Sequence, residues 1–397
     1  MNESEHVILI GGNDGTVLEV AGTDVPIVLF QLPSRASEVQ IRGTAMAFHF
    51  DYPDTPMLFE LGRAVMRQRR LSGVVSFLDR GLLPAARLSE HLGLRGNPVL
   101  PVENSLDKLR FRQVTSELCP ADVAELGSAT DATEFLAKVH APIVVKPRFG
   151  SGSRGVTYVD NEAAARTAYA HASRLGDGHV IAERFVDGPE YSVESLSLEG
   201  VHRILGITRK ITSGPPHFVE LAHEFPAPLS AAAGERLGSM TLQMLDCLGH
   251  RQGPAHTEAR LTADGVFLIE TQSRHGGDQI WEMVKLVTGV SQAQQTIAHL
   301  ARSRQPAPRP IAKAAAIRFF ALENRRVERI GGLEEARGMA GIIRVVCHLH
   351  PGQQLGPVEC SADRQGYVMG IGASLEEARQ RVADAWHSIV IETREAE

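Results

Sequence analysis

The stretch from Ile143 to Asp160 reads IVVKPRFGSGSRGVTYVD. A β-branched run ends on Lys146, a loop with three glycines follows, and a second apolar run begins at Val156. This pattern predicts two strands joined by a flexible polar turn. Glycines let backbone N–H groups wrap an anion, and a lysine beside them adds a cation for phosphate oxygens. The loop opens no helix, unlike a Walker A or dinucleotide loop, so it is either another kind of phosphate lid or a plain turn.

Length and composition are those of a globular protein. With 397 residues the chain is long enough for two or three domains, and its net charge of −6 at pH 7 argues against a general nucleic-acid binder. No apolar run approaches the roughly 20 residues that span a membrane, and the acidic N-terminus is unlike a signal peptide. The four cysteines lie far apart without metal-site spacing, so we expect a reduced, cytoplasmic protein without disulfides or structural zinc.

The first 100 residues alternate between strand and helix patterns. Strands are expected at Val7–Ile10, Pro26–Leu32 and Gly73–Leu78, and helices at Phe59–Arg70 and Leu82–Leu92. This alternation predicts a parallel α/β sheet. Asp79 and Arg80 follow the third strand, at the carboxyl edge where open α/β sheets bind ligands. They are therefore either substrate contacts or part of an ordinary surface turn.

A break at Asn97–Pro101 separates this sheet from a helix. We expect Asn104 or Ser105 to cap that helix and Pro120 to end it. Lys108 lies in the first turn, where the helix dipole favours anions rather than cations. It is therefore either a solvated lysine or one placed there for a function.

Two carboxylates are the main feature of the region after the glycine loop. The expected elements are a helix at Asn161–Leu175, strands at Val180–Glu183 and Tyr191–Leu198, an irregular region at His202–Leu229, a helix at Ser230–Leu248, and strands at Ala255–Leu261 and Val266–Glu270. Strand alternation lets Glu258 and Glu270 face the same side, where they form either a Mg²⁺ site or a pair neutralised by Arg260 and Arg274. Gln272 shares the face of Glu270 if its strand continues.

The last segment follows a proline-rich linker at Ala301–Pro310. Strands are expected at Ala314–Phe320, Ile342–Leu349 and Tyr367–Gly370, before a final helix whose capping box runs from Ser374 to Glu377. We expect a small α+β domain that carries no motif of its own.

Taken in order, the motifs of residues 100–300 resemble the ATP-grasp superfamily, and within it the L-amino-acid ligases, or dipeptide synthetases. They are Lys108, Lys146 with its glycine loop, Glu183-Arg-Phe-Val186, Gly188-Pro-Glu190, Phe218-Val-Glu220-Leu-Ala-His223, His256-Thr-Glu258, and Leu268-Ile-Glu270 with Arg274. The resemblance implies a mixed α/β and α+β protein with an ATP-grasp fold. A Rossmann-like pre-domain would occupy residues 1–100, the ATP-grasp domain 101–305 with a lid at about 120–185, and the α+β domain 306–397.

The resemblance also implies a role for each motif residue. ATP phosphates would be contacted by Lys108, Lys146, Ser151, Ser153 and Arg154, adenine by Glu183, Phe185 and Val186, and the ribose by Glu190. Metal ligands would be Glu258, Glu270 and Gln272, although the family often has asparagine at the last position. Glu220 and His223 would meet the acid substrate, and Arg274 would steady the reaction intermediates.

The function implied is that of an ATP-dependent carboxylate–amine ligase. It would use ATP with Mg²⁺ or Mn²⁺ to convert a small carboxylic acid into an acyl phosphate, which an amine then attacks to give an amide, with release of ADP and phosphate. We expect a homodimer, the common default. Two alternatives are an ATP-grasp enzyme that activates bicarbonate and a non-catalytic nucleotide-binding protein.

Overall fold

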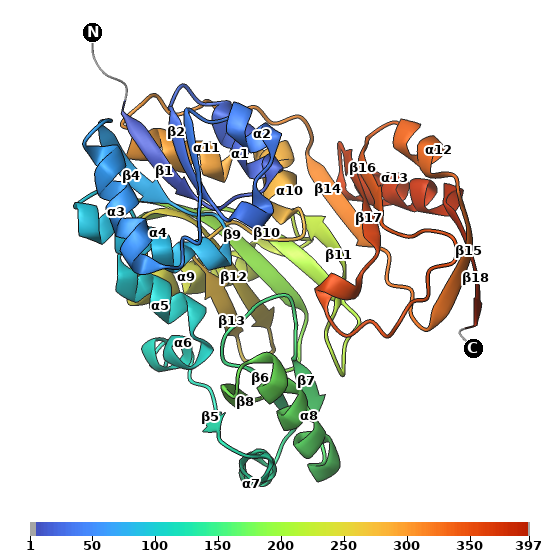
Figure 1. Ribbon diagram of the computed structural model, residues 1–397. Helices are drawn as coiled ribbons and strands as arrows, with labels where there is room; N and C mark the ends of the chain where they lie inside the picture. Colours follow the sequence, from blue (N-terminus) through green and yellow to red (C-terminus); the bar gives the residue numbers. More distant parts are fainter. Residues whose placement is uncertain (1–4, 396–397) are drawn as a thin grey trace.

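The computed structural model describes residues 5–395. Three lobes meet around a central sheet (Figure 1). The N-terminal lobe (residues 5–96) is blue in the figure, the lid lobe (residues 122–186) is green, and the C-terminal lobe (residues 314–395) is orange to red. No helix among these residues is long and apolar enough to cross a membrane.

The N-terminal lobe is the expected parallel sheet, with strand order β3-β2-β1-β4. Its elements are β1 His6–Ile10, α1 Asp14–Ala21, β2 Ile27–Gln31, α2 Glu38–Arg42, β3 Met46–His49, α3 Thr55–Met66, β4 Leu71–Val75 and α4 Asp79–Leu92. Sequence patterns missed β3, and β4 ends at Val75 rather than at Leu78. Asp79 consequently begins α4 instead of lying in a loop.

Helix α11, Gln292–Leu300, completes the core of this lobe although it comes late in the chain. Its Ile297 and Leu300 pack in one buried cluster with Val7 and Leu9 of β1. The same helix also packs against the strands at residues 190–198 and 253–261, where Gln292 Nε2 donates to the Ser195 backbone oxygen at 2.8 Å, so the domain boundary expected at residue 305 stays a prediction.

The helix expected to start at Asn104 or Ser105 begins later. Both residues lie inside α5, Val99–Leu106, and the next helix is α6, Lys108–Val114. Asp107 caps α6, because its Oδ1 accepts hydrogen bonds from the backbone N–H groups of residues 109 and 110. Lys108 is thus the first residue of α6, and it is buried rather than solvated.

The lid lobe contains the expected hairpin. Its sheet has the order β5-β8-β6-β7. The elements are β5 Val123–Leu126, α7 Ala129–Val139, β6 Ile143–Pro147, β7 Thr157–Val159, α8 Glu162–Leu175 and β8 Val180–Arg184. β6 and β7 pair antiparallel on either side of the glycine loop, as predicted.

The largest sheet has eight antiparallel strands in the order β13-β12-β9-β10-β11-β14-β17-β16. The strands that precede the linker are β9 Glu190–Leu198, β10 Val201–Thr212, β11 Glu220–Phe225, β12 Gly253–Leu261 and β13 Val266–Gln272, accompanied by α9 Ala231–Leu248 and α10 Ile280–Thr288. The prediction of an irregular region at His202–Leu229 was wrong, because this region contains β10 and β11. These strands look polar because charged residues such as Lys210 and His223 are buried in the site.

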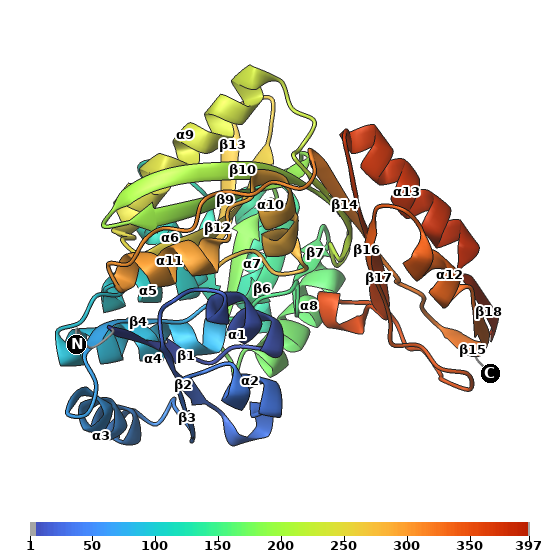
Figure 2. The same ribbon diagram turned by 90° about the horizontal axis from the view of Figure 1, so that it is seen from above.

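The C-terminal lobe extends this sheet with three strands and adds a separate two-stranded sheet, β15-β18 (Figure 2). β14 pairs with β11, so that Ala222 lies opposite Arg318 and Phe225 opposite Ala315. The elements are β14 Ala314–Phe319, β15 Arg325–Gly331, α12 Leu333–Gly338, β16 Ile342–Cys347, β17 Gly366–Gly372, α13 Leu375–Ser388 and β18 Val390–Glu395. The linker before it has no helix or strand from residue 303 to residue 312.

Candidate active site

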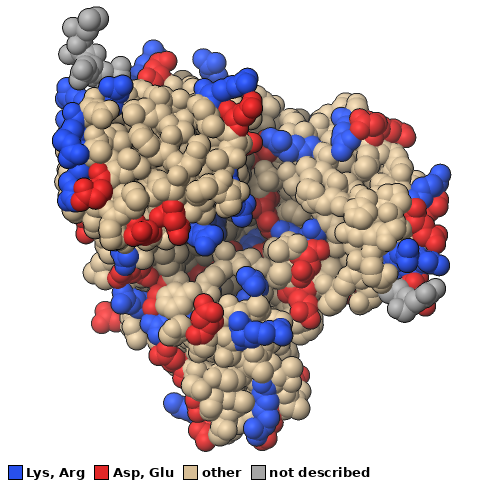
Figure 3. Space-filling model, viewed as in Figure 1, with Lys and Arg blue, Asp and Glu red and all other residues tan. Residues whose placement is uncertain are grey.

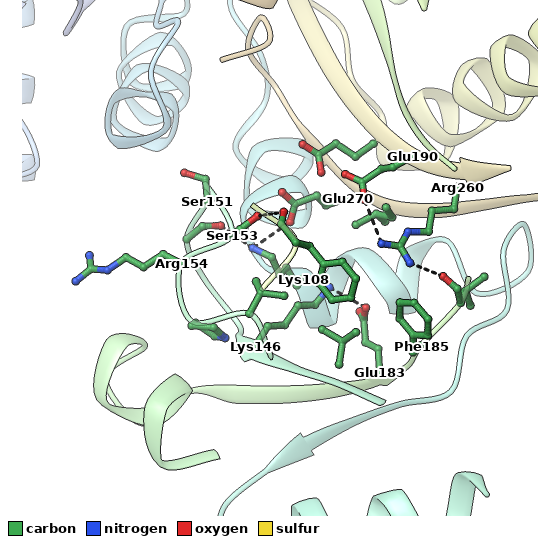
Figure 4. A pocket seen from close by; sticks show the side chains of 18 of the residues that line it. Lys108, Lys146, Ser151, Ser153, Arg154, Glu183, Phe185, Glu190, Arg260 and Glu270 are labelled. Atoms are coloured by element: carbon green, nitrogen blue, oxygen red, sulfur yellow. Dashed lines mark hydrogen bonds and ion pairs between the residues drawn. The ribbon is translucent and has the colours of Figure 1, made fainter. Parts of the chain in front are cut away.

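One pocket lies between the glycine loop and the large sheet (Figure 4). It is lined by every residue predicted to bind the nucleotide: Lys108, Lys146, Ser151, Ser153, Arg154, Glu183, Phe185, Val186 and Glu190. Glu220, Glu258 and Glu270 also line it. Acidic and basic side chains are visible in the hollow where the three lobes meet (Figure 3). The exposed side chain of Arg154 extends away from the other labelled residues (Figure 4).

The glycine loop contacts every part of the molecule that surrounds the pocket. Ser151 Oγ donates to Asp79 of the N-terminal lobe over 3.1 Å, and Ser153 Oγ donates to the backbone oxygen of Phe218 over 3.3 Å. The Gly152 oxygen accepts the backbone N–H of Ser361, from the C-terminal lobe, at 3.1 Å. The loop therefore covers the pocket in a closed arrangement.

Two lysines lie at the end of the pocket where the sequence predicts ATP phosphates. Lys108 Nζ is 3.1 Å from Glu270 Oε2, and Lys146 Nζ is 2.7 Å from Glu183 Oε2. Burial tends to raise the pKa of the Glu183 carboxyl, but the Arg112 and Lys146 cations outweigh it and lower this pKa to about 2. Glu183 is therefore a charged anchor for Lys146, and its contact with adenine stays a prediction. Sequence reasoning missed Arg112, which stands one helical turn after Lys108 on the same face.

The other end of the pocket is aromatic. The rings of Phe185 and Phe218 stack with centroids 5.6 Å apart, and the Arg260 guanidinium lies 4.9 and 5.0 Å from them. Arg260 also donates to the Val186 oxygen at 2.7 Å and pairs with Glu190 at 3.3 Å. Flat rings beside a fixed cation form a surface on which a purine can stack.

Glu258 and Glu270 lie directly opposite each other on β12 and β13, as expected. The partners suggested for a neutralised pair were wrong, because Arg260 and Arg274 form their ion pairs with other residues. Glu258 is 2.8 Å from Lys210 Nζ and 3.2 Å from His256 Nε2. Burial tends to raise the pKa of Glu258, but Lys210 outweighs it and holds this pKa well below its ordinary value.

The donor set at these carboxylates fits Mg²⁺. Gln272 Nε2 donates to Glu270 Oε1 at 2.6 Å, while Gln272 Oε1 is buried without a partner among the described residues. Two carboxylates and a spare amide oxygen are ligands of the kind that Mg²⁺ takes. Since residues 5–395 hold no cluster of three His, Cys, Asp or Glu side chains arranged for a metal, phosphate or water oxygens would complete the coordination.

A buried lysine on β10 joins three of the predicted subsites. Lys210 Nζ lies 2.8 Å from Glu190, 2.8 Å from Glu258 and 3.3 Å from Glu220, and its side chain is 2% exposed. Sequence reasoning missed Lys210 because it assigned this region no regular structure.

The predicted acid-substrate residues face the C-terminal lobe. His223 Nε2 lies 3.4 Å from Asp278 Oδ2, and Arg364 donates to Asp278 Oδ1 at 2.6 Å. Ser361 Oγ donates to the Glu220 carboxylate. Ser361 and Arg364 had no signal in the sequence, because they lie in and just after a short 3₁₀ helix, Ser361–Asp363, that carries no motif.

Arg274 is held by the N-terminal lobe. Its Nε and Nη2 donate to the two oxygens of Asp79, at 2.6 and 3.0 Å, and its Nη1 donates to the His275 backbone oxygen at 3.0 Å. His223, Gln272 and Arg274 do not line the pocket described above. Gln272 is connected to the pocket through Glu270, and Arg274 through Asp79 and Ser151. His223 is connected to it through Asp278 and Arg364, which donates to the Glu220 backbone oxygen at 3.0 Å.

Known proteins match this chain in sequence and in fold. Residues 139–282 match the ATP-grasp domain family, and residues 318–394 match the L-amino acid ligase C-terminal domain 2 family. An uncharacterized protein of Sinorhizobium fredii is 31% identical over 335 residues, covering 80% of this chain and 68% of that protein. A formate-dependent phosphoribosylglycinamide formyltransferase of Burkholderia lata is 28% identical over 284 residues, covering 68% of this chain and 65% of that protein.

The chain thus spans about two thirds of the length of these curated relatives. Among solved structures, an L-amino acid ligase from Bacillus licheniformis superposes with a TM-score of 0.83 at 23% identity, covering 99% of both chains. The fold match includes the pre-domain, the lid and the C-terminal lobe. The chain therefore carries an ATP-grasp domain and an L-amino acid ligase C-terminal domain 2, and it belongs to one family with the Sinorhizobium fredii protein.

Proposed function

We propose that the protein is an ATP-dependent L-amino-acid ligase. It would join the carboxylate of one amino acid to the amine of a second small molecule and release ADP and phosphate. The observation that carries this proposal is the position of Lys210 between Glu220, Glu190 and Glu258. One lysine thereby brings the predicted acid-substrate residue beside the nucleotide and metal residues, which is the proximity that phosphoryl transfer to an acid requires.

The first step would be attack of the acid's carboxylate on the γ-phosphorus of ATP. A carboxylate O–P bond forms, the bond to the bridging β–γ oxygen breaks, and ADP leaves. Lys108 and Lys146 are the cations that would neutralise charge on the transferred group. Glu258, Glu270 and Gln272 would hold Mg²⁺, which when bound supplies further positive charge to the phosphate oxygens.

The second step would be attack of a neutral amine on the acyl carbon. The C–O bond to phosphate breaks, and the departing phosphate takes up the proton that the amine nitrogen loses. The carbonyl oxygen becomes negative as the amine adds, and a fixed guanidinium such as that of Arg274 stabilises such an oxyanion. Closure of the glycine loop would keep water from the acyl phosphate.

The experiment is a screen for ADP and phosphate release over pairs of amino acids, with the product identified by mass spectrometry. We expect ADP release that requires both an acid and an amine, with one amide formed per ADP. ADP release that requires bicarbonate and ignores amino acids would establish the bicarbonate alternative instead. Tight ATP binding without turnover on any pair would support the non-catalytic alternative. The homodimer and the cytoplasmic location stay predictions from the sequence.

The metal assignment has its own test. Glu270→Gln removes a charge that faces Glu258 across the two strands, so we expect the Mg²⁺ concentration for half-maximal ADP release to rise at least about tenfold. Mn²⁺ titration should show the same shift. An unchanged Mg²⁺ titration would remove Glu270 from the ligand set.

A further inference from the structure

Asp79 links three segments that lie far apart in the sequence. It is the first residue of α4 in the N-terminal lobe. Its Oδ1 accepts from Arg274 Nε at 2.6 Å, and its Oδ2 accepts from Arg274 Nη2 at 3.0 Å and from Ser151 Oγ at 3.1 Å. One carboxylate therefore holds both the arginine predicted to stabilise the oxyanion and the loop that covers the phosphates.

The contact with Arg274 fixes the direction of the guanidinium as well as its position. A single hydrogen bond lets this planar group rotate, whereas two parallel bonds to one carboxylate do not. With the third bond to His275, two of the five N–H groups of Arg274 have no partner among residues 5–395. Asp79 determines where those two N–H groups point.

Helix capping does not account for Asp79. The N-cap of α4 is Leu78, and the helix starts without a hydrogen bond from a capping side chain. The Asp79 carboxylate instead turns toward Arg274 and the lid, and its side chain is 34% exposed. An ionised carboxylate is compatible with this place, since the first turn of a helix favours negative charge.

We propose that Asp79 is a positioning residue that aims Arg274 at the acyl group and makes this alignment depend on lid closure through Ser151. The proposal rests on the proposed ligase function. When the glycine loop opens, Asp79 loses the bond from Ser151, so the orientation of Arg274 and the exclusion of water change together. Amide formation is then favoured only while the acyl phosphate is protected.

The first test is a double-mutant cycle on the acid–amine pair that the wild type joins. Asp79→Asn keeps the shape of the side chain but places an amide against the guanidinium. We expect it to lower amide formation about 10- to 100-fold, to change ATP affinity less than about threefold, and to raise the ratio of ADP released to amide formed. Because Asp79 acts on the acyl group through Arg274, the variant Asp79→Asn/Arg274→Ala should be slower than Arg274→Ala by no more than the factor that Ser151→Ala alone produces.

The matched control is Asp54→Asn, which changes an exposed carboxylate at the start of α3 in the same lobe. It should leave the ratio of ADP to amide and ATP affinity unchanged. If the rate losses of Asp79→Asn and Arg274→Ala multiply in the double variant, the positioning role is overturned. The same holds if Asp79→Asn lowers ATP affinity and amide formation by equal factors, because Asp79 is then a structural residue.

The second test needs no turnover. Arg154 is exposed in the glycine loop, so trypsin cleavage after it, identified by fragment mass, reports loop opening. With a non-hydrolysable ATP analogue and Mg²⁺, we expect Ser151→Ala and Asp79→Asn to be cleaved about 3- to 10-fold faster than the wild type and Asp54→Asn. Equal rates would overturn the link to the lid. If the wild type joins no acid–amine pair, the ligase function and the aiming of Arg274 both fail, and this test still decides whether Asp79 holds the loop.

Discussion

Single side chains in the site depend on partners from other strands. Lys210 on β10 lies between Glu190 of β9, Glu220 of β11 and Glu258 of β12. Burial tends to lower the pKa of Lys210, but the three carboxylates outweigh it and raise this pKa well above its ordinary value. Without the lysine, three negative charges would face one another in a buried place, which is strongly unfavourable.

We therefore expect Lys210→Met to lower the free energy of unfolding by about 3–5 kcal/mol. Mg²⁺ should restore more stability in the variant than in the wild type, because it would replace part of the missing positive charge. Thermal denaturation with and without Mg²⁺ measures both effects. Lys138→Met, which changes an exposed lysine of α7, is the control and should change neither value. A variant as stable as the wild type would show that the three carboxylates do not need Lys210.

A buried histidine outside the pocket predicts a pH dependence of stability. Burial, with a smaller contribution from His202, lowers the pKa of His250 from 6.5 to about 4. The unfolded chain then binds a proton at a higher pH than the folded chain does. The contribution of this pKa difference to the free energy of unfolding is complete above pH 6.5 and is lost as the pH falls through about 4. Its upper limit is about 3 kcal/mol.

Denaturant unfolding between pH 7 and pH 4 tests this expectation. His250→Gln should lose less stability than the wild type over that range, whereas His387→Gln, at an exposed site in α13, should follow the wild type. Parallel curves for all three proteins would contradict the depressed pKa.

Sequence reasoning finds residues that carry a motif and misses residues that act through distant contacts. Lys146, Glu258 and Glu270 were predicted because their neighbours in the chain form a glycine loop and paired strands. Asp79 was noted only as an edge residue, because its partner Arg274 is 195 positions away. Lys210 gave no signal, since a charged residue in a polar stretch is usually exposed.

At the scale of elements, the glycine loop depends on backbone conformations that favour glycine. Gly152 has φ +72°, and a Cβ there would meet only the Ser361 side chain at 3.8 Å, which is an ordinary contact. Gly152→Ala should therefore cost about 1 kcal/mol through backbone strain rather than through a clash. We expect ATP affinity to fall about fivefold, measured by calorimetry.

Gly178→Ala is the matched control for this prediction. Gly178 has φ +85° and free space around its Cα, but it lies in the turn between α8 and β8. The substitution should lower stability by a similar amount and leave ATP affinity unchanged. An equal loss of affinity in both variants would show that the closed loop does not depend on Gly152.

Elements with clear periodicity were predicted well, and those whose burial is unusual were not. β1, β2, α8 and the hairpin of β6 and β7 follow apolar runs or capping residues that are local in the sequence. β10 and β11 were not predicted from the sequence, because they bury charged side chains in the site. The predicted start of α6 was wrong because Asp107, rather than Asn104 or Ser105, caps this helix.

At the scale of the whole molecule, the C-terminal lobe is part of the central sheet. Phe225 and Met283, from the central region, share one buried cluster with Ile317 and Met369 of the lobe. Ending the chain at residue 310 would expose these apolar residues and the unpaired edge of β11. We expect the shortened protein to aggregate, measured by light scattering after expression.

The control is a chain that ends at residue 389, which removes β18, its pairing with β15 and the packing of Ile391 against the lobe, but leaves the central sheet intact. This protein should remain soluble and bind ATP. A soluble, ATP-binding protein ending at residue 310 would contradict the dependence of the central sheet on the C-terminal lobe.

Domain order was predictable from the sequence, whereas the packing between domains was not. The alternation of strands and helices in residues 1–100 and the linker at 301–310 are local patterns. That β14 would pair with β11, or that α11 would cover β1, depends on contacts between segments about 90 and 290 residues apart. A local sequence pattern does not indicate which distant segment an element will contact.

The position of α11 has a consequence for how the chain is made. The face of the first sheet that carries Val7 and Leu9 is completed by Ile297 and Leu300. All strands of the first sheet have been synthesised by about residue 100. At roughly 5–20 residues per second, the helix that covers this face is synthesised roughly 10–40 seconds later. The first lobe to leave the ribosome is thus among the last to be closed, and for that interval its apolar surface is open to chaperones.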